Sequence, residues 1–71
     1  MPIYQIGIYN RFIRDKIRSG EDVGEEEAAW EDIHYFDIEA ATEKDAKRVI
    51  QSEYKESKGF VIDCIDLYRS L

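Results

Sequence analysis

Residues 33–68 form one strand–helix–strand pattern, and this unit constrains the fold more than any other part of the chain. Over 34–40, apolar and polar residues alternate, which predicts a strand with one buried face. A helix is expected over 43–58, ended by Gly59, and a second strand over 60–67. A helix that joins two strands of one sheet makes a right-handed crossover, so these strands should run parallel.

The helix expected over 43–58 has a clear start and one apolar stripe. Thr42 precedes it as an N-cap, and acidic residues in the first turn suit the positive end of the helix. A packing role on a sheet follows from the spacing of its apolar residues. These are Ala46, Val49, Ile50 and Tyr54.

The N-terminal part predicts a third strand and a short helix. Residues 3–9 alternate, with Tyr4, Ile6 and Ile8 on one face. Asn10 can cap a helix from Arg11 to Ser19, for which Gly20 is a suitable end. An extended, hairpin-like excursion is the alternative for this segment. The first strand should pair antiparallel with one of the parallel pair, and a position between them is one arrangement.

The last strand has apolar residues on both sides. Simple alternation places Phe60, Ile62 and Cys64 on one face and Val61, Asp63, Ile65 and Leu67 on the other. Either the strand is central in the sheet, or a bulge near Cys64 switches its faces.

Residues 19–32 are expected to form a solvated loop, with one helical turn over 25–30. Trp30 stands out in it as a large apolar ring among acids. It is either an anchor that holds the loop on the core or an exposed contact residue.

The fold prediction is therefore one α+β domain over residues 1–71. It has a three-stranded mixed sheet, one long helix in a split βαβ arrangement, and a short helix after the first strand. The second face of the sheet is closed either by the short helix and Trp30 or by a partner.

Composition limits the function classes. The chain has 71 residues, 44% hydrophobic residues and a net charge of −6, which suits a small folded protein rather than a disordered one. No apolar run is long enough for a membrane helix, and a signal peptide is not expected. Cys64 is the single cysteine, so no internal disulfide can form. The expected location is the cytoplasm.

The residue set for catalysis is poor, and we expect no enzyme, cofactor or metal. His34 is the only histidine, so a histidine metal site or a Ser-His-Asp triad cannot be built around it. Cys64 lies in an apolar strand, where a thiol is inert. The acids near Glu25 lack the spacing of a calcium loop.

Charge is unevenly distributed, which suggests two binding modes. Residues 21–45 are strongly acidic and attract basic protein surfaces. The expected protein contacts are Glu25, Glu26, Glu27 and Trp30 first, and Tyr9 and Tyr35 second. The rival is nucleic-acid binding, disfavoured by the net charge. It would use Arg11, Arg14, Lys16 and Arg18. A homodimer is the third possibility.

One resemblance bears on function. The opening Tyr4-Gln5-Ile6-Gly7-Ile8-Tyr9-Asn10-Arg11, with Trp30, His34-Tyr35, Glu39-Ala40 and Gly59-Phe60-Val61-Ile62, resembles short uncharacterised proteins of tailed phages and bacteria. The element order is also similar to that of the ribosomal protein LX fold, in topology only. The phage resemblance implies a small accessory factor, in the host cytoplasm, that binds a host protein and alters its activity, by inhibition or by activation.

The expected function is therefore that of a small acidic, non-enzymatic protein-binding module, with inhibition as one outcome. The alternative is an RNA- or ribosome-associated protein that uses the basic segment.

Overall fold

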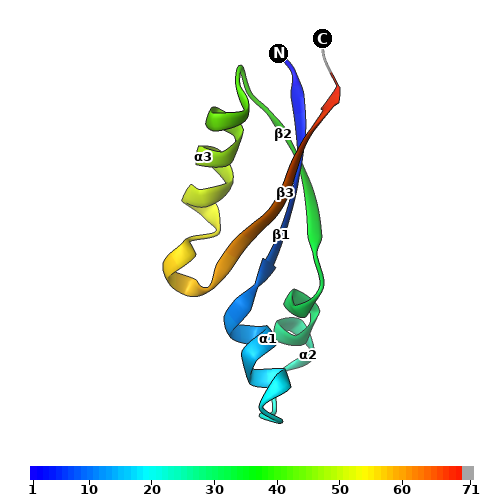
Figure 1. Cartoon of the computed structure of the whole chain (residues 1–71), viewed down its shortest axis with the longest axis vertical. Coiled ribbons are helices and arrows are strands. Elements are labelled where there is room, and N and C mark those ends of the chain that lie inside the picture. The colour runs from blue at the N-terminus through cyan, green and yellow to red at the C-terminus, as the bar shows by residue number, and fades with distance from the viewer. Residues whose placement is uncertain (70–71) are drawn as a thin grey trace.

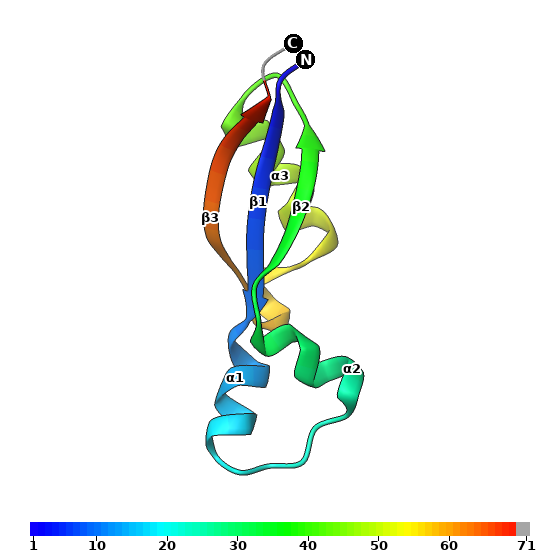
Figure 2. The ribbon, with the colours of Figure 1, turned by 90° about the vertical axis from the view of Figure 1, so that its right-hand side faces the viewer.

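The computed structural model describes residues 1–69, which form a three-stranded sheet with one helix on one face (Figures 1 and 2). The molecule is elongated, 45 × 19 × 16 Å. In chain order the elements are β1 (Ile3–Asn10), α1 (Arg11–Arg18), α2 (Glu25–Ala28), the 3-10 turn η1 (Ala29–Glu31), β2 (His34–Glu39), α3 (Glu43–Glu53), the 3-10 turn η2 (Glu56–Lys58) and β3 (Phe60–Arg69).

The sheet has the order β2-β1-β3, and β1 pairs antiparallel with both neighbours. β2 and β3 therefore run in the same direction, as the crossover argument requires, but they do not pair with each other. The expected α+β class is confirmed, whereas the sheet is antiparallel rather than mixed. The reason is that β1 lies between the two strands that would otherwise form a parallel pair.

A bulge in β3 explains the apolar residues on both of its sides. Gly7 lies opposite Cys64 and Ile8 lies opposite Ile62, which leaves Asp63 without a partner on β1. One extra residue reverses the alternation, so the faces predicted by simple counting are wrong after Asp63. The β3 residues on the α3 side are Phe60, Ile62, Ile65 and Leu67.

The core lies between α3 and the sheet. Ile6 and Ile8 from β1 are buried against Ala46 and Ile50 of α3. Val49 was expected in this stripe but is 43% exposed, because α3 contacts the sheet only through a narrow face.

The long helix ends earlier than expected. α3 stops at Glu53, because Tyr54 leaves the helical conformation (φ −118°, ψ 85°) while its N–H still bonds to Ile50. The chain then turns through η2 to reach the sheet edge, and Gly59 takes a left-handed conformation with φ +96°. The predicted glycine stop is therefore present, at the end of η2 rather than of α3.

Asn10 joins the end of β1 to α1 and to the start of β3. Its side-chain oxygen accepts hydrogen bonds from Phe12 N (2.9 Å) and Ile13 N (3.2 Å) and so caps α1, as predicted. Its side-chain nitrogen donates to the carbonyl of Lys58 (3.1 Å). One buried amide thereby fixes α1 on the η2–β3 junction.

α1 ends as the sequence predicts. Gly20 has φ +79° and its N–H bonds to the carbonyl of Ile17, while the N–H of Glu21 bonds to that of Lys16. This is the Schellman pattern of a glycine-terminated helix. α1 and α2 extend beyond one end of the sheet rather than over its second face (Figure 2).

Trp30 is an anchor. Its ring lies 5.4 Å from Tyr54, 5.1 Å from Phe60 and 4.3 Å from His34, measured between ring centroids. Phe36 completes this aromatic cluster on the α3 side of the sheet. The loop that follows α1 is thus fixed to the core at η1.

We expect Gly59→Ala to destabilise the fold much more than Gly20→Ala does. Both glycines have positive φ, which costs an L-residue about 1–2 kcal/mol. A Cβ at Gly59 would also lie 2.5 Å from Asn10 Oδ1 and 2.6 Å from the Phe12 ring, whereas one at Gly20 meets nothing within 4 Å. Urea unfolding of both variants measures the difference, and equal losses would contradict the role given to the Asn10 junction.

Candidate protein-binding surface

Within residues 1–69 no helix covers the sheet face opposite α3, and Figure 2 looks onto this face. Strand alternation and the β3 bulge determine which side chains belong to this open face. The residues of the open face are Ile3, Gln5, Gly7, Tyr9, Tyr35, Asp37, Glu39, Val61, Cys64, Asp66 and Arg69.

The centre of the open face is apolar because Gly7 has no side chain. A Cβ at Gly7 would lie 2.9 Å from Cys64 Sγ, 2.9 Å from Ile33 Cγ2 and 3.0 Å from Tyr35 Cε1. Side chains from both neighbouring strands therefore converge over β1 at this point. Tyr35 is nevertheless 57% exposed. We call Ile33, Tyr35 and Cys64 the apolar patch.

Carboxylates lie beside the apolar patch. Gln5 lies opposite Asp37 on β2 and opposite Asp66 on β3, and Asp63 is exposed at the bulge. Among residues 1–69 the one ion pair within 4.0 Å joins the N-terminal amine to Glu39, so these three aspartates have no cationic partner. We call Asp37, Asp63 and Asp66 the acidic rim.

Tyr9, a predicted contact, is partly covered. The guanidinium of Arg14 lies 3.7 Å from the centroid of its ring, a cation–π contact. Arg14 also donates from Nε to the carbonyl of Glu31 (2.8 Å). Arg14 is thereby held against the protein, and of the two predicted tyrosines Tyr35 is the more accessible.

The other predicted protein contacts are not on the open face. Glu25, Glu26 and Glu27 are exposed on α2, beyond the end of the sheet, and Trp30 packs on the α3 side. The structure therefore does not bring Trp30 together with Tyr35.

The predicted basic segment lies beside acidic residues. α1 carries all four cations and contacts both α2 and η1. A shallow hollow is lined by Arg14, Ile17, Arg18, Glu31 and Asp32. Glu31 and Asp32 therefore weaken the positive field of Arg14 and Arg18 at this hollow.

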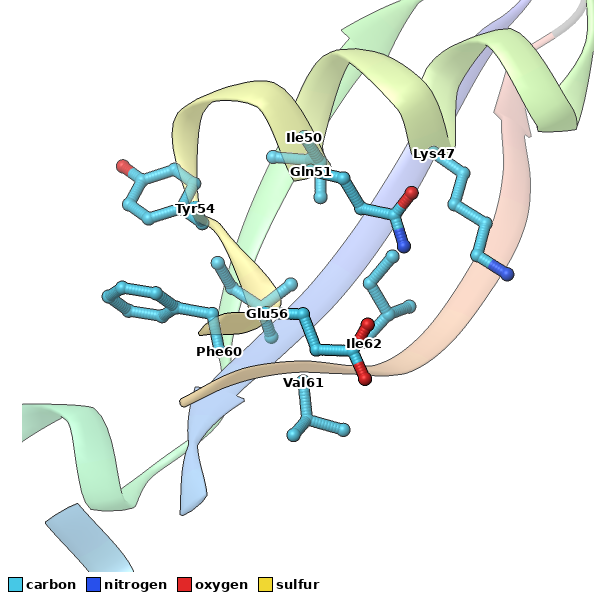
Figure 3. Close-up of a pocket in the computed structure, with 9 residues that line it drawn as sticks. Lys47, Ile50, Gln51, Tyr54, Glu56, Phe60, Val61 and Ile62 are labelled. Atoms are coloured by element: carbon cyan, nitrogen blue, oxygen red, sulfur yellow. The ribbon is translucent and has the colours of Figure 1, made fainter. Parts of the chain in front are cut away.

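A cavity of about 240 Å³ opens on the other side of the sheet, between α3 and the start of β3 (Figure 3). Its walls are apolar side chains such as Ile50, Phe60 and Ile62. Lys47, Gln51 and Glu56 also line it, and Figure 3 shows their polar ends around its opening.

Sequence reasoning left one part of this arrangement open and missed two others. Simple alternation grouped Cys64 with Phe60 and Ile62, and the alternative, a bulge near Cys64, is the one that the structure has and that places Cys64 on the open face. The acidic rim was not singled out, although the alternation of β2 already places Asp37 on the same face as Tyr35. The cavity has no signal in the sequence, because it depends on where α3 ends.

The side chains that could carry chemistry are held in structural contacts or lie apart from one another. His34 Nε2 lies 2.7 Å from the carbonyl of Ala29, next to the ring of Trp30. Within residues 1–69, no three His, Cys, Asp or Glu side chains are placed to hold a metal ion. No helix in the described part of the chain is long and apolar enough to cross a membrane.

Comparison with known proteins finds no matching family model, no similar curated protein and no similar solved structure. The resemblances drawn from the sequence stay predictions.

We expect Trp30→Ala to lower the free energy of unfolding by about 2–4 kcal/mol, because it removes the ring at the middle of the aromatic cluster. Tyr68→Ala is the control, since Tyr68 is 62% exposed and should change stability by about 0.5 kcal/mol or less. Thermal and urea unfolding measure both. If Trp30→Ala lowered the free energy of unfolding only as little as the control does, Trp30 would be an exposed contact residue rather than an anchor.

Proposed function

We propose that this domain is a non-enzymatic protein-binding module whose open face binds a positively charged segment of a partner. The observation that carries the proposal is the combination of the apolar patch with the acidic rim. The patch offers Tyr35, 57% exposed, above Gly7, and the rim offers three carboxylates without cations. An apolar centre with a charged border is the usual anatomy of a protein interface.

Tyr35 is the residue of the patch that we expect to contribute most to affinity. It combines a large ring with a hydroxyl, and its backbone is held in β2 by the ladder with β1. Tyrosines near the centre of an interface are frequent hot spots. Asp37 and Asp66 lie on either side of Gln5 and would orient a lysine- or arginine-bearing segment across the sheet.

Electrostatics favour a protein partner over RNA. A sheet face that binds RNA combines exposed aromatics with cations, because the phosphate backbone supplies most of the affinity. Here the exposed aromatic Tyr35 has aspartates near it, and Arg14 at the edge is held by Tyr9 and Glu31. Arg69 lies opposite Ile3, whereas Tyr35 lies opposite Gly7, so this cation is at the far end of the face from Tyr9. The cations on α1 also lie next to acids of η1.

Binding of this kind would act by covering a surface of the partner, and no catalytic residue in this domain is needed for it. A basic surface that is covered by the domain is no longer available to its own acidic ligand, so inhibition is the expected effect on the partner.

The path of β2, α3 and β3 around the central β1 is the one expected for a split βαβ unit, and we assign the domain to that class.

We expect the double variant Asp37→Lys/Asp66→Lys to lose affinity for basic peptides by about tenfold or more, because like charges would then meet in the interface. The peptides are selected from a random library on the immobilised protein and measured by fluorescence anisotropy. The matched control Glu26→Lys/Glu27→Lys makes the same change of net charge on α2 and should retain most of the affinity.

Two results would overturn the proposal. One is a selection that yields no lysine- or arginine-rich peptides. The other is an affinity that falls in Glu26→Lys/Glu27→Lys and is unchanged in Asp37→Lys/Asp66→Lys. That result would place the binding site at residues 25–27 instead. Tight binding of single-stranded RNA that is lost on Arg11→Ser/Lys16→Ser/Arg18→Ser would favour the RNA alternative.

A further inference from the structure

We infer that the bound segment adds to the sheet as a fourth strand along β3, with an apolar side chain in the cavity between α3 and β3. This inference rests on the proposed function, because it takes the same basic partner. One part of the partner lies on the open face at Tyr35 and Asp37, and the part that reaches the outer edge of β3 takes the extended conformation described here. The segment would alternate apolar residues, directed to the α3 side, with lysine or arginine, directed to the open face.

The outer edge of β3 is available for pairing. β3 is at one end of the order β2-β1-β3 and forms its ladder with β1 alone. Within residues 1–69, no backbone hydrogen bond outside the sheet uses a group of residues 60–69. Such an edge presents N–H and C=O groups that pair with an added strand about 4.8 Å away.

The cavity lies where a side chain of an added strand would point. It lies beside Phe60, Val61 and Ile62 at the beginning of that edge, with the last turns of α3 as the opposite wall (Figure 3). At about 240 Å³ it is smaller than the cavities of roughly 300–1,000 Å³ that hold drug-sized ligands. Its size and apolar walls suit one large apolar side chain of a peptide.

The polar groups at the opening suit the peptide backbone around that side chain. Lys47 and Gln51 come from α3 and Glu56 from η2, so donors and an acceptor surround the opening. Leu67 extends the apolar surface of β3 on the same side and is 58% exposed. An added strand would cover Leu67 with its next inward-facing side chains.

Charge determines the outward-facing side chains. In a strand, successive side chains point to opposite faces, so residues next to the one in the cavity lie over the open face. Those near the cavity lie close to the bulge, where Asp63 is exposed, and outward-facing residues further along the added strand meet Asp66; neither aspartate has a cationic partner in residues 1–69. Lysine or arginine at these positions would neutralise both.

The same charges argue against a second copy of this chain as the occupant. Pairing of β3 with β3 of another molecule would bring two further aspartates to an edge that already has two. Like charges on adjoining strands are destabilising, so a foreign basic strand fits better than a copy of β3.

The test compares two synthetic peptides of the same composition and charge. In one, lysine alternates with valine or leucine over about eight residues, and in the other the apolar residues are contiguous. Calorimetry measures affinity, and amide hydrogen exchange by NMR measures protection of β3. We expect the alternating peptide to bind about tenfold tighter and to slow exchange of β3 amides whose N–H groups point outward.

A cavity variant separates this mode from simple attraction to the open face. Gln51→Trp places a bulky ring at the opening and should remove the tenfold preference while leaving the weaker binding of the second peptide. Ser52→Trp is the matched control, because Ser52 is the exposed next residue of α3 and does not line the cavity.

Equal affinities of the two peptides, both lost in Asp37→Lys/Asp66→Lys and without protection of β3, would overturn strand addition and leave the proposed function intact. Affinities that are unaffected by Asp37→Lys/Asp66→Lys would overturn the proposed function itself. Self-association of the free protein with protected β3 amides would show that a second copy occupies the edge, and would also overturn the inference.

Discussion

The antiparallel ladders on both sides of β1 are the interaction on which the rest of the structure depends. β1 alone has hydrogen-bonded neighbours on two sides, and its residues supply the centre of the core and of the open face. At its end, Asn10 caps α1 and bonds to Lys58, so the end helix and the start of β3 are positioned from the same strand. β1 also contributes to the difference between the two faces, because its large apolar residues Ile6 and Ile8 point to one face and Gly7 to the other.

The two faces are unequal because α3 covers one face only. On the α3 side, Ile6 and Ile8 are fully buried, and the aromatic cluster around Trp30 closes the end of the core. On the other side, Gly7 lets Ile33, Tyr35 and Cys64 cover β1 with their own side chains. A small domain of this kind keeps part of its apolar surface in water, and binding is one way to cover it.

Local features were predictable from the sequence because they depend on neighbouring residues alone. The caps at Asn10 and Thr42, the glycine turns at Gly20 and Gly59 and the short turn before Trp30 belong to this group. Features that depend on distant pairing could be predicted only as alternatives. A position of β1 between the other two strands and a bulge near Cys64 were each one of two possibilities, because the choice follows from the register of strands far apart in the chain.

The most direct test of the account is to map, residue by residue, where a selected basic peptide binds. Backbone amide shifts of the 15N-labelled protein would be followed by NMR during titration with that peptide. The account predicts the largest changes at Tyr35, Asp37, Cys64 and Asp66, with little change over residues 25–27. Amide shift changes confined to α1 and α2, with no changes in the sheet, would contradict the account.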